Sequence, residues 1–136
     1  MGSTIGRPVS IIPSDIPNLE LWLRGERGVT LNGSTVSQWN YQSPNAFHVS
    51  QVSGPNQPTF LASSSNFGGR PSLLFASASS QSLIRGSTNI FDSSSFTLFI
   101  VKKRNNDVNM MVFASTQAAP SQGLLIGDFQ TSARYD

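Results

Sequence analysis

The stretch Phe96-Thr97-Leu98-Phe99-Ile100-Val101-Lys102-Lys103 decides the fold that the sequence predicts. Successive side chains of a β-strand point to opposite faces, so its even-numbered and odd-numbered residues form two separate rows. Both rows are largely apolar up to Val101, which is typical of a central strand that is packed above and below. The basic residues that follow carry the chain into solvent. We therefore expect an all-β domain built around this strand.

Short β-prone runs, separated by Gly, Pro, Asn and Ser, recur along the rest of the chain. The clearest hairpin signal is Asn32-Gly33, which lies between Val29–Leu31 and Ser34–Val36 and favours the positive φ angles of a tight turn. Leu19–Arg24 alternates as a strand does. The other predicted strands are Thr59–Leu61, Ser72–Phe75, Gln81–Ile84, Met110–Ala114 and Gly123–Gly127. This succession of short strands and turns predicts a sandwich or a barrel.

Composition narrows the classes of partner. The 136 residues suffice for one domain with a real core, and charged residues make up only 12% of them, about half the usual share. The net charge is +2, and the one basic run, Lys102–Arg104, has no interleaved aromatic residues, so nucleic acid is not favoured. The absence of cysteine excludes disulfides and Cys-based metal or redox sites. No segment has the length of a membrane span or the pattern of a signal peptide.

The sequence divides into an N-terminal extended arm, residues 1–16, and a β-sandwich domain, residues 17–136. Gly and Pro punctuate the arm, and its apolar residues follow no helical pattern. Such an arm should lie on its own sandwich or on a neighbouring chain. The residues predicted to form this partner interface are Ile5, Val9, Ile11 and Ile12.

Several motifs, taken in order, resemble concanavalin A-like (laminin-G-like) domains of phage and bacterial surface proteins. Asp15–Leu23 is similar to the family opening P-x-x-I-P-x-L-x-L-W-L. Val36–Asn45 comes next and is similar to the family stretch V-x-x-W-x-D-x-S-G-N. Gln57–Phe60, Gly69–Phe75 and the strand Phe96–Val101 continue the resemblance, which covers roughly residues 13–127. It implies a two-sheet antiparallel jelly-roll sandwich. The core it implies contains Trp22, Trp39, Phe75, Phe96, Leu98, Phe99 and Ile100.

Two departures from the family pattern bear on function. The family loop Asp-x-Ser-Gly-Asn is here Tyr41-Gln42-Ser43-Pro44-Asn45, which lacks its acidic residue. Family domains also commonly continue for several strands beyond the one that resembles Gly123–Gly127. The sandwich is therefore expected to be a shortened version, a piece of a longer protein, or one completed by a partner chain. Missing strands would expose edges and core, which favours assembly into an oligomer.

The residue patterns do not favour catalysis or a metal site. Glycoside hydrolysis needs two carboxylates that flank the scissile bond, whereas Glu20 and Glu26 lie on either side of a turn. His48 is the only histidine, and no Gly-x-Ser-x-Gly elbow is present. The oxygen-rich turn at residues 105–109 has one carboxylate, which is weak for Ca²⁺. We predict no enzyme activity, no cofactor and no metal.

Two main hypotheses for function remain, with a glycoside hydrolase remnant as a third, minor option. The first is a structural component of a phage virion surface, a capsid decoration or fibre-associated domain that binds neighbouring subunits. The second is an extracellular carbohydrate-binding, lectin-like module that recognises a cell-surface polysaccharide, for which the fold resemblance is the only motive. Its ligand-binding candidates are Tyr41, expected to be exposed for stacking on a sugar, with Asn45 and His48 in the same loop.

Overall fold

The computed structural model of the chain describes residues 12–43, 48–86 and 95–104, together with the backbone of residues 110–114 and 125–128. Most regular structure in these residues is β-strand, which confirms the all-β prediction. The helical structure within the described ranges consists of short 3-10 turns: η1 (Pro13–Asp15), η2 (Gly54–Asn56), η3 (Ser65–Phe67) and η4 (Ser77–Ser79). No helix in this part of the chain is long and apolar enough to cross a membrane.

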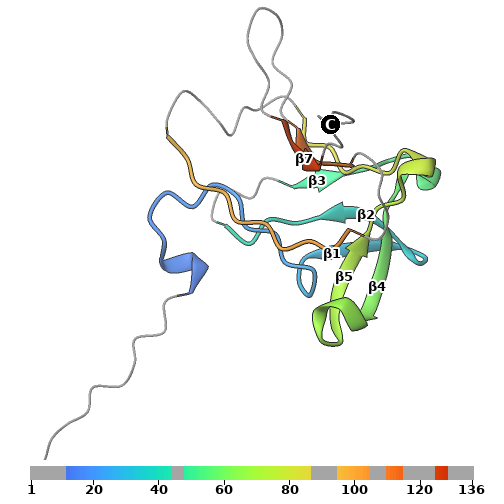
Figure 1. Cartoon of the computed structure of the whole chain (residues 1–136), viewed down its shortest axis with the longest axis horizontal. Coiled ribbons are helices and arrows are strands. Elements are labelled where there is room, and N and C mark those ends of the chain that lie inside the picture. The colour runs from blue at the N-terminus through green and yellow to red at the C-terminus, as the bar shows by residue number, and fades with distance from the viewer. Residues whose placement is uncertain (1–11, 44–47, 87–94, 105–109, 115–124, 129–136) are drawn as a thin grey trace, which may run out of the picture.

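The strands form one open antiparallel sheet and one separate hairpin (Figure 1). The sheet has the order β1-β2-β4-β5, and β3 pairs with β2 on the edge that β4 also uses. Its members are β1 (Val29–Asn32), β2 (Thr35–Trp39), β3 (Val49–Ser50), β4 (Thr59–Ser64) and β5 (Arg70–Leu74). The hairpin pairs β6 (Met110–Ala114) with β7 (Leu125–Asp128). The coarse prediction of an antiparallel all-β fold thus agrees with the structure.

The hairpin predicted at Asn32-Gly33 is confirmed as β1–β2. Asn32 pairs with Thr35, so the two turn residues are Gly33 and Ser34. Of these two, Gly33 has a positive φ of 63°, a value that glycine adopts without a steric penalty. The turn lies one residue later than the sequence pattern suggested, because the strand pairing includes Asn32.

The sheet is strongly twisted, as β4 and β5 run steeply across the direction of β1 and β2 (Figure 1). The turn before β1 packs against the opposite edge strand. A Cβ on Gly25 would lie only 2.7 Å from the backbone oxygen of Pro71 in β5. Because only glycine permits this approach, Gly25 holds the turn against β5.

The core of the described residues is small and lies where β2 meets the start of β4. Val36 and Pro58 are its fully buried side chains, and the Val36 amide donates to the Pro58 oxygen at 2.8 Å. Next to them lies Gln57, a polar side chain that is only 2% exposed. Its Oε1 accepts hydrogen bonds from Asn32 Nδ2 at 3.1 Å and from Thr35 Oγ1 at 2.7 Å. The centre of the sheet is therefore held by hydrogen bonding as much as by apolar packing.

Leu19–Arg24 is not a strand, which corrects the prediction made from its alternation. The segment follows Asn18, whose φ of 58° lies in the left-handed region, and only Arg24 forms an isolated bridge, to Arg27. Single hydrogen bonds hold it instead: the Trp22 oxygen accepts from the Gln42 amide at 2.7 Å. The neighbouring chain here is a loop, so no ladder can form. Gln81–Ile84 is likewise reduced to one bridge, between Ile84 and Ser50.

The predicted central strand is also wrong, and with it much of the predicted core. Residues 95–104 are assigned to no strand, and Phe99 is 88% exposed, Phe96 50% and Ile100 41%. A strand that is apolar on both faces needs a layer on each side. No described segment forms a ladder with this one, so Phe99 and Val101 remain almost fully in water. Leu98 is half-buried.

The three remaining core predictions have different outcomes. Phe75 follows the last residue of β5 and is 37% exposed, so its prediction is wrong. A side chain just beyond a strand end has lost the neighbours that would cover it. Trp22 and Trp39 are both half-buried, neither fully buried as core residues nor open to solvent.

Candidate interaction surface

Phe96–Val101, which we call the 96–101 segment, carries the most conspicuous exposed apolar side chains of the described chain. Its exposure alternates. Phe96, Leu98 and Ile100 are about half-covered, whereas Phe99 and Val101 are 88% and 87% exposed. This is the alternation of an extended chain with one face directed inward. The two rows of side chains expected from the sequence thus differ in exposure, whereas the prediction of a central strand is wrong.

The carboxyl end of this segment runs onto β4 and β5. Lys103 lines a hollow of about 40 Å³ together with residues of both strands and of η3. In Figure 1 the segment, coloured orange, extends from there past β1 and β2. Its outer face, formed by Phe99 and Val101, is left uncovered. An extended segment with one covered and one bare apolar face is suited to receive another protein layer.

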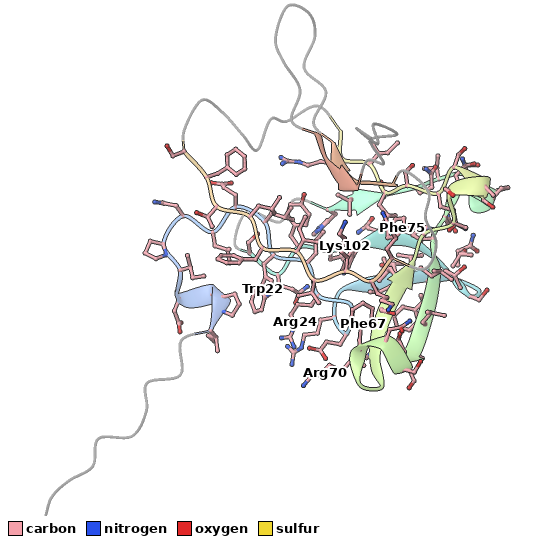
Figure 2. The ribbon with its side chains drawn as sticks, in the orientation of Figure 1. Trp22, Arg24, Phe67, Arg70, Phe75 and Lys102 are labelled. Carbon is pink, nitrogen blue, oxygen red and sulfur yellow. The ribbon has the colours of Figure 1, made fainter. Side chains whose placement is uncertain are left out.

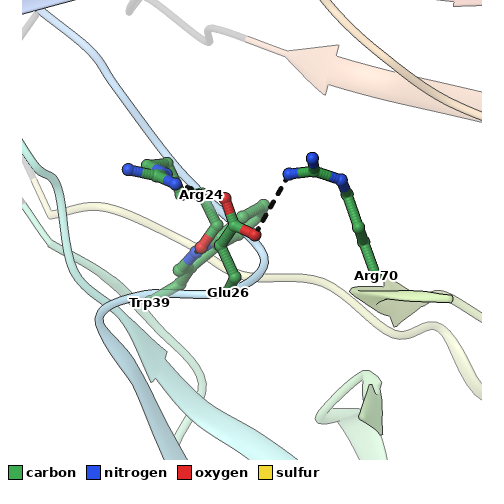
Figure 3. A network of polar contacts seen from close by, with 4 residues as sticks. All are labelled: Arg24, Glu26, Trp39 and Arg70. Carbon is green, nitrogen blue, oxygen red and sulfur yellow. Dashed lines mark hydrogen bonds and ion pairs between the residues drawn. The ribbon is translucent and has the colours of Figure 1, made fainter. Parts of the chain in front are cut away.

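A network of charged side chains lies elsewhere, where the turn before β1 meets β5 (Figures 2 and 3). Glu26 accepts a hydrogen bond from Arg24, and its second oxygen lies 3.5 Å from a guanidinium nitrogen of Arg70. The Arg24 guanidinium lies 5.5 Å from the centre of the Trp22 ring. The backbone oxygen of Arg24 accepts a hydrogen bond from Trp39 Nε1 at 2.7 Å. The network fastens the turn to β5, which is a structural role.

The sequence does not reveal this network. Arg24 and Glu26 are neighbours along the chain, but Arg70 reaches them only because the turn crosses to β5. The one available signal was Gly25, whose close approach to Pro71 becomes apparent only in the folded chain.

Glu26 is held in its ionised form. The hydrogen bond from Arg24 lowers the pKa of the Glu26 carboxyl from the ordinary value of 4.5, and the charges of Arg24, Arg70 and Arg27 act in the same direction, against the opposing effect of desolvation. A lowered pKa in the folded state stabilises it at pH values above the ordinary one. That stabilisation is lost as the pH falls through the lowered value.

Changing Glu26 to Gln should therefore remove part of the pH dependence of stability. We expect the urea midpoint of the wild type to fall between about pH 6.5 and about pH 3.5 by more than that of the E26Q variant. The difference should be small, because the network is exposed to solvent. Equal acid sensitivity of E26Q and the wild type would contradict the role given to Glu26.

The predicted ligand-binding residues are not brought together on an open face. Tyr41 is 6% exposed, so its predicted exposure is wrong, because the loop folds inward beside Trp22 and Gln42. Burial raises the pKa of the Tyr41 hydroxyl, and Arg85 partly opposes this increase. His48 is exposed, and Asn45 lies outside the described residues.

The predicted arm interface is only partly visible. Ile12, at the start of η1, is 50% exposed. Ile5, Val9 and Ile11 lie outside the described residues, as does the turn at residues 105–109. Within the described ranges, no three His, Cys, Asp or Glu residues are grouped so that they could hold a metal ion.

Comparison with known proteins adds no relative. No protein-family model, curated protein or solved structure matches the chain. Its function is therefore inferred from the geometry described above.

Proposed function

We propose that this protein is a non-catalytic structural protein that adheres to neighbouring subunits through the 96–101 segment. Its proposed setting is the surface of a phage virion, as a capsid decoration or fibre-associated domain. The observation that carries the proposal is the outer face of this segment, where Phe99 and Val101 are almost fully exposed.

The energetic argument favours adhesion through this face. Full burial of one large apolar side chain contributes roughly 1.5–3 kcal/mol. Two such side chains, together with the half-covered Phe96 and Ile100, offer enough apolar surface to drive association with another protein. The alternating exposure also fits the addition of a strand, in which backbone hydrogen bonds supply affinity and side chains supply specificity.

The proposed fold is a concanavalin A-like jelly roll of which the open sheet forms one layer. Support comes from the antiparallel order β1-β2-β4-β5 and from the 96–101 segment, whose inner face has the apolar pattern of a second layer. A partner strand that pairs with the backbone of this segment would extend that layer.

The charged network supports a non-catalytic role for Glu26. A general acid in glycoside hydrolysis needs a raised pKa, so that it is protonated near neutral pH. The pKa of Glu26 is instead lowered by Arg24, and its oxygens are engaged by Arg24 and Arg70.

The carbohydrate-binding alternative has lost its principal candidate for contact with a sugar. Tyr41, the aromatic ring that was to stack on a sugar, is buried. Of the other two candidates, His48 alone falls within the described residues, and its exposure does not by itself favour a sugar. Adhesion to protein is therefore the proposal we retain.

Photo-crosslinking in the native assembly tests this proposal. With benzoylphenylalanine at position 99, we expect one discrete adduct, identified by mass spectrometry as a subunit of the same particle. The same probe at position 52 is the control, because Val52 is also apolar and is 97% exposed. Its adducts should be weak and heterogeneous. Equal adduct patterns at both positions, or none at position 99, would rule out adhesion through this face.

A further inference from the structure

We propose that the partner of the 96–101 segment is the same segment of a second copy of this chain, paired antiparallel about a two-fold axis at Phe99. This inference rests on the proposed adhesive function and names the neighbour. It follows from the backbone, the side-chain rows and the positions of the charges.

The backbone of residues 97–101 can receive a strand. These residues belong to no ladder and carry no proline, and their trace crosses the sheet without a turn (Figure 1). Each therefore offers an N–H and a C=O for pairing. An apolar, β-branched and aromatic run in this state is the kind of segment that pairs with another chain.

The side chains match in the antiparallel register centred on Phe99. Phe99 then lies opposite Phe99 of the second copy, and Thr97 lies opposite Val101 on the same, exposed face. On the inner face, Leu98 lies opposite Ile100. Aromatic pairs and aliphatic pairs directly across a ladder stabilise a sheet. The register places every apolar residue from 98 to 100 opposite another apolar residue.

Charge selects the antiparallel arrangement over the parallel one. In-register parallel pairing would place the basic runs at Lys102–Arg104 side by side, which is unfavourable. In the antiparallel register Lys103 lies opposite Ser95 of the other copy. At 3.4 Å per residue, the two Lys103 residues are then about 27 Å apart, well beyond the screening length of about 8 Å at physiological salt.

Two single-cysteine variants provide a sharp test, because the chain contains no cysteine of its own. Residues directly opposite in an antiparallel ladder have Cα atoms about 4.5–5.5 Å apart, within the range of a disulfide. In the proposed register the Phe99→Cys thiols face each other. The Val101→Cys thiols lie four residues out of register, about 14 Å apart. Phe99 and Val101 are equally exposed, 88% and 87%, so collisional reactivity is matched.

We expect Phe99→Cys to form the disulfide-linked dimer roughly tenfold or more faster than Val101→Cys under mild oxidation, because pairing raises the effective concentration of its thiols. A mixture of Thr97→Cys and Val101→Cys chains should form the mixed dimer preferentially. Light scattering of the wild type should give the mass of a dimer.

Three results would overturn the inference: a monomeric or polydisperse wild type, equal crosslinking rates at positions 99 and 101, or homodimers in place of the mixed dimer. The photo-crosslinking experiment separates this failure from that of the proposed function. A position-99 adduct with a different particle subunit would leave the adhesive function in place and remove only the second copy as partner.

Discussion

Replacing Gly28 with alanine is expected to lower the free energy of unfolding by about 3 kcal/mol. Gly28 has a φ of +72°, in the region that L-residues avoid. A Cβ at this position would also lie 2.9 Å from the backbone oxygen of Asn40 and 2.6 Å from Nε2 of Gln42. The Gln42 amide can move, but the Asn40 backbone cannot do so freely, because the Asn40 N–H donates to the Gly28 oxygen at 2.7 Å.

Gly33→Ala is the matched control for this prediction. Gly33 has a similar φ of +63°, but nothing lies within 4 Å of an added Cβ. It should therefore show only the backbone penalty, about 1 kcal/mol. Urea unfolding followed by tryptophan fluorescence measures both variants. Equal losses in the two variants would mean that Gly28 is not confined by Asn40.

Truncating Gln57 to alanine should destabilise the protein by a similar amount, about 3 kcal/mol. Its amide joins three parts of the sheet. Oε1 accepts from Asn32 of β1 and Thr35 of β2, and Nε2 donates to the Gln51 backbone oxygen, after β3, at 2.7 Å. Truncation removes the partner of these half-buried or exposed groups and leaves a side-chain-sized void at a position that is only 2% exposed, and such a void is costly.

Gln38→Ala controls for loss of a glutamine side chain as such. Gln38 lies in β2, is only half-buried, and donates from Nε2 to Oδ1 of Asn40. Its truncation should cost about 1 kcal/mol or less. Thermal unfolding of the two variants, compared at matched pH, gives the difference. If Gln57→Ala lowered stability no more than Gln38→Ala does, the hydrogen bonds of the buried amide would not stabilise the sheet as proposed.

Sequence reasoning succeeded where one neighbourhood of the chain decides the structure. Gly33 allows the tight turn, and the β-prone runs on both sides of it pair as β1 and β2. The runs predicted at residues 59–61 and 72–75 are the strands β4 and β5, with shifted ends. Turn chemistry and alternation act over a few residues, so they can be recognised without knowledge of the rest of the fold.

The predictions from the sequence failed where burial of a side chain depends on segments that are distant in the chain. Phe99 and Phe75 have the large apolar side chains that are typical of a core, but no described layer covers them. Tyr41 appeared to be a loop residue open to solvent, yet the chain around Trp22 folds against it. The hydrophobicity of a side chain indicates that it favours burial, but it does not indicate which surface will cover it.

The sequence by itself determined that this chain is all-β, where its clearest hairpin turns, and that the side chains of the 96–101 segment alternate between two faces. These properties follow from backbone preferences of adjacent residues. Only the tertiary structure decided that Gly25 meets Pro71, that Arg70 reaches Glu26, that Gln57 is buried, and that the outer face of Phe99 and Val101 is bare. Each of these depends on which segments, far apart in the chain, the twisted sheet brings into contact and which it leaves uncovered.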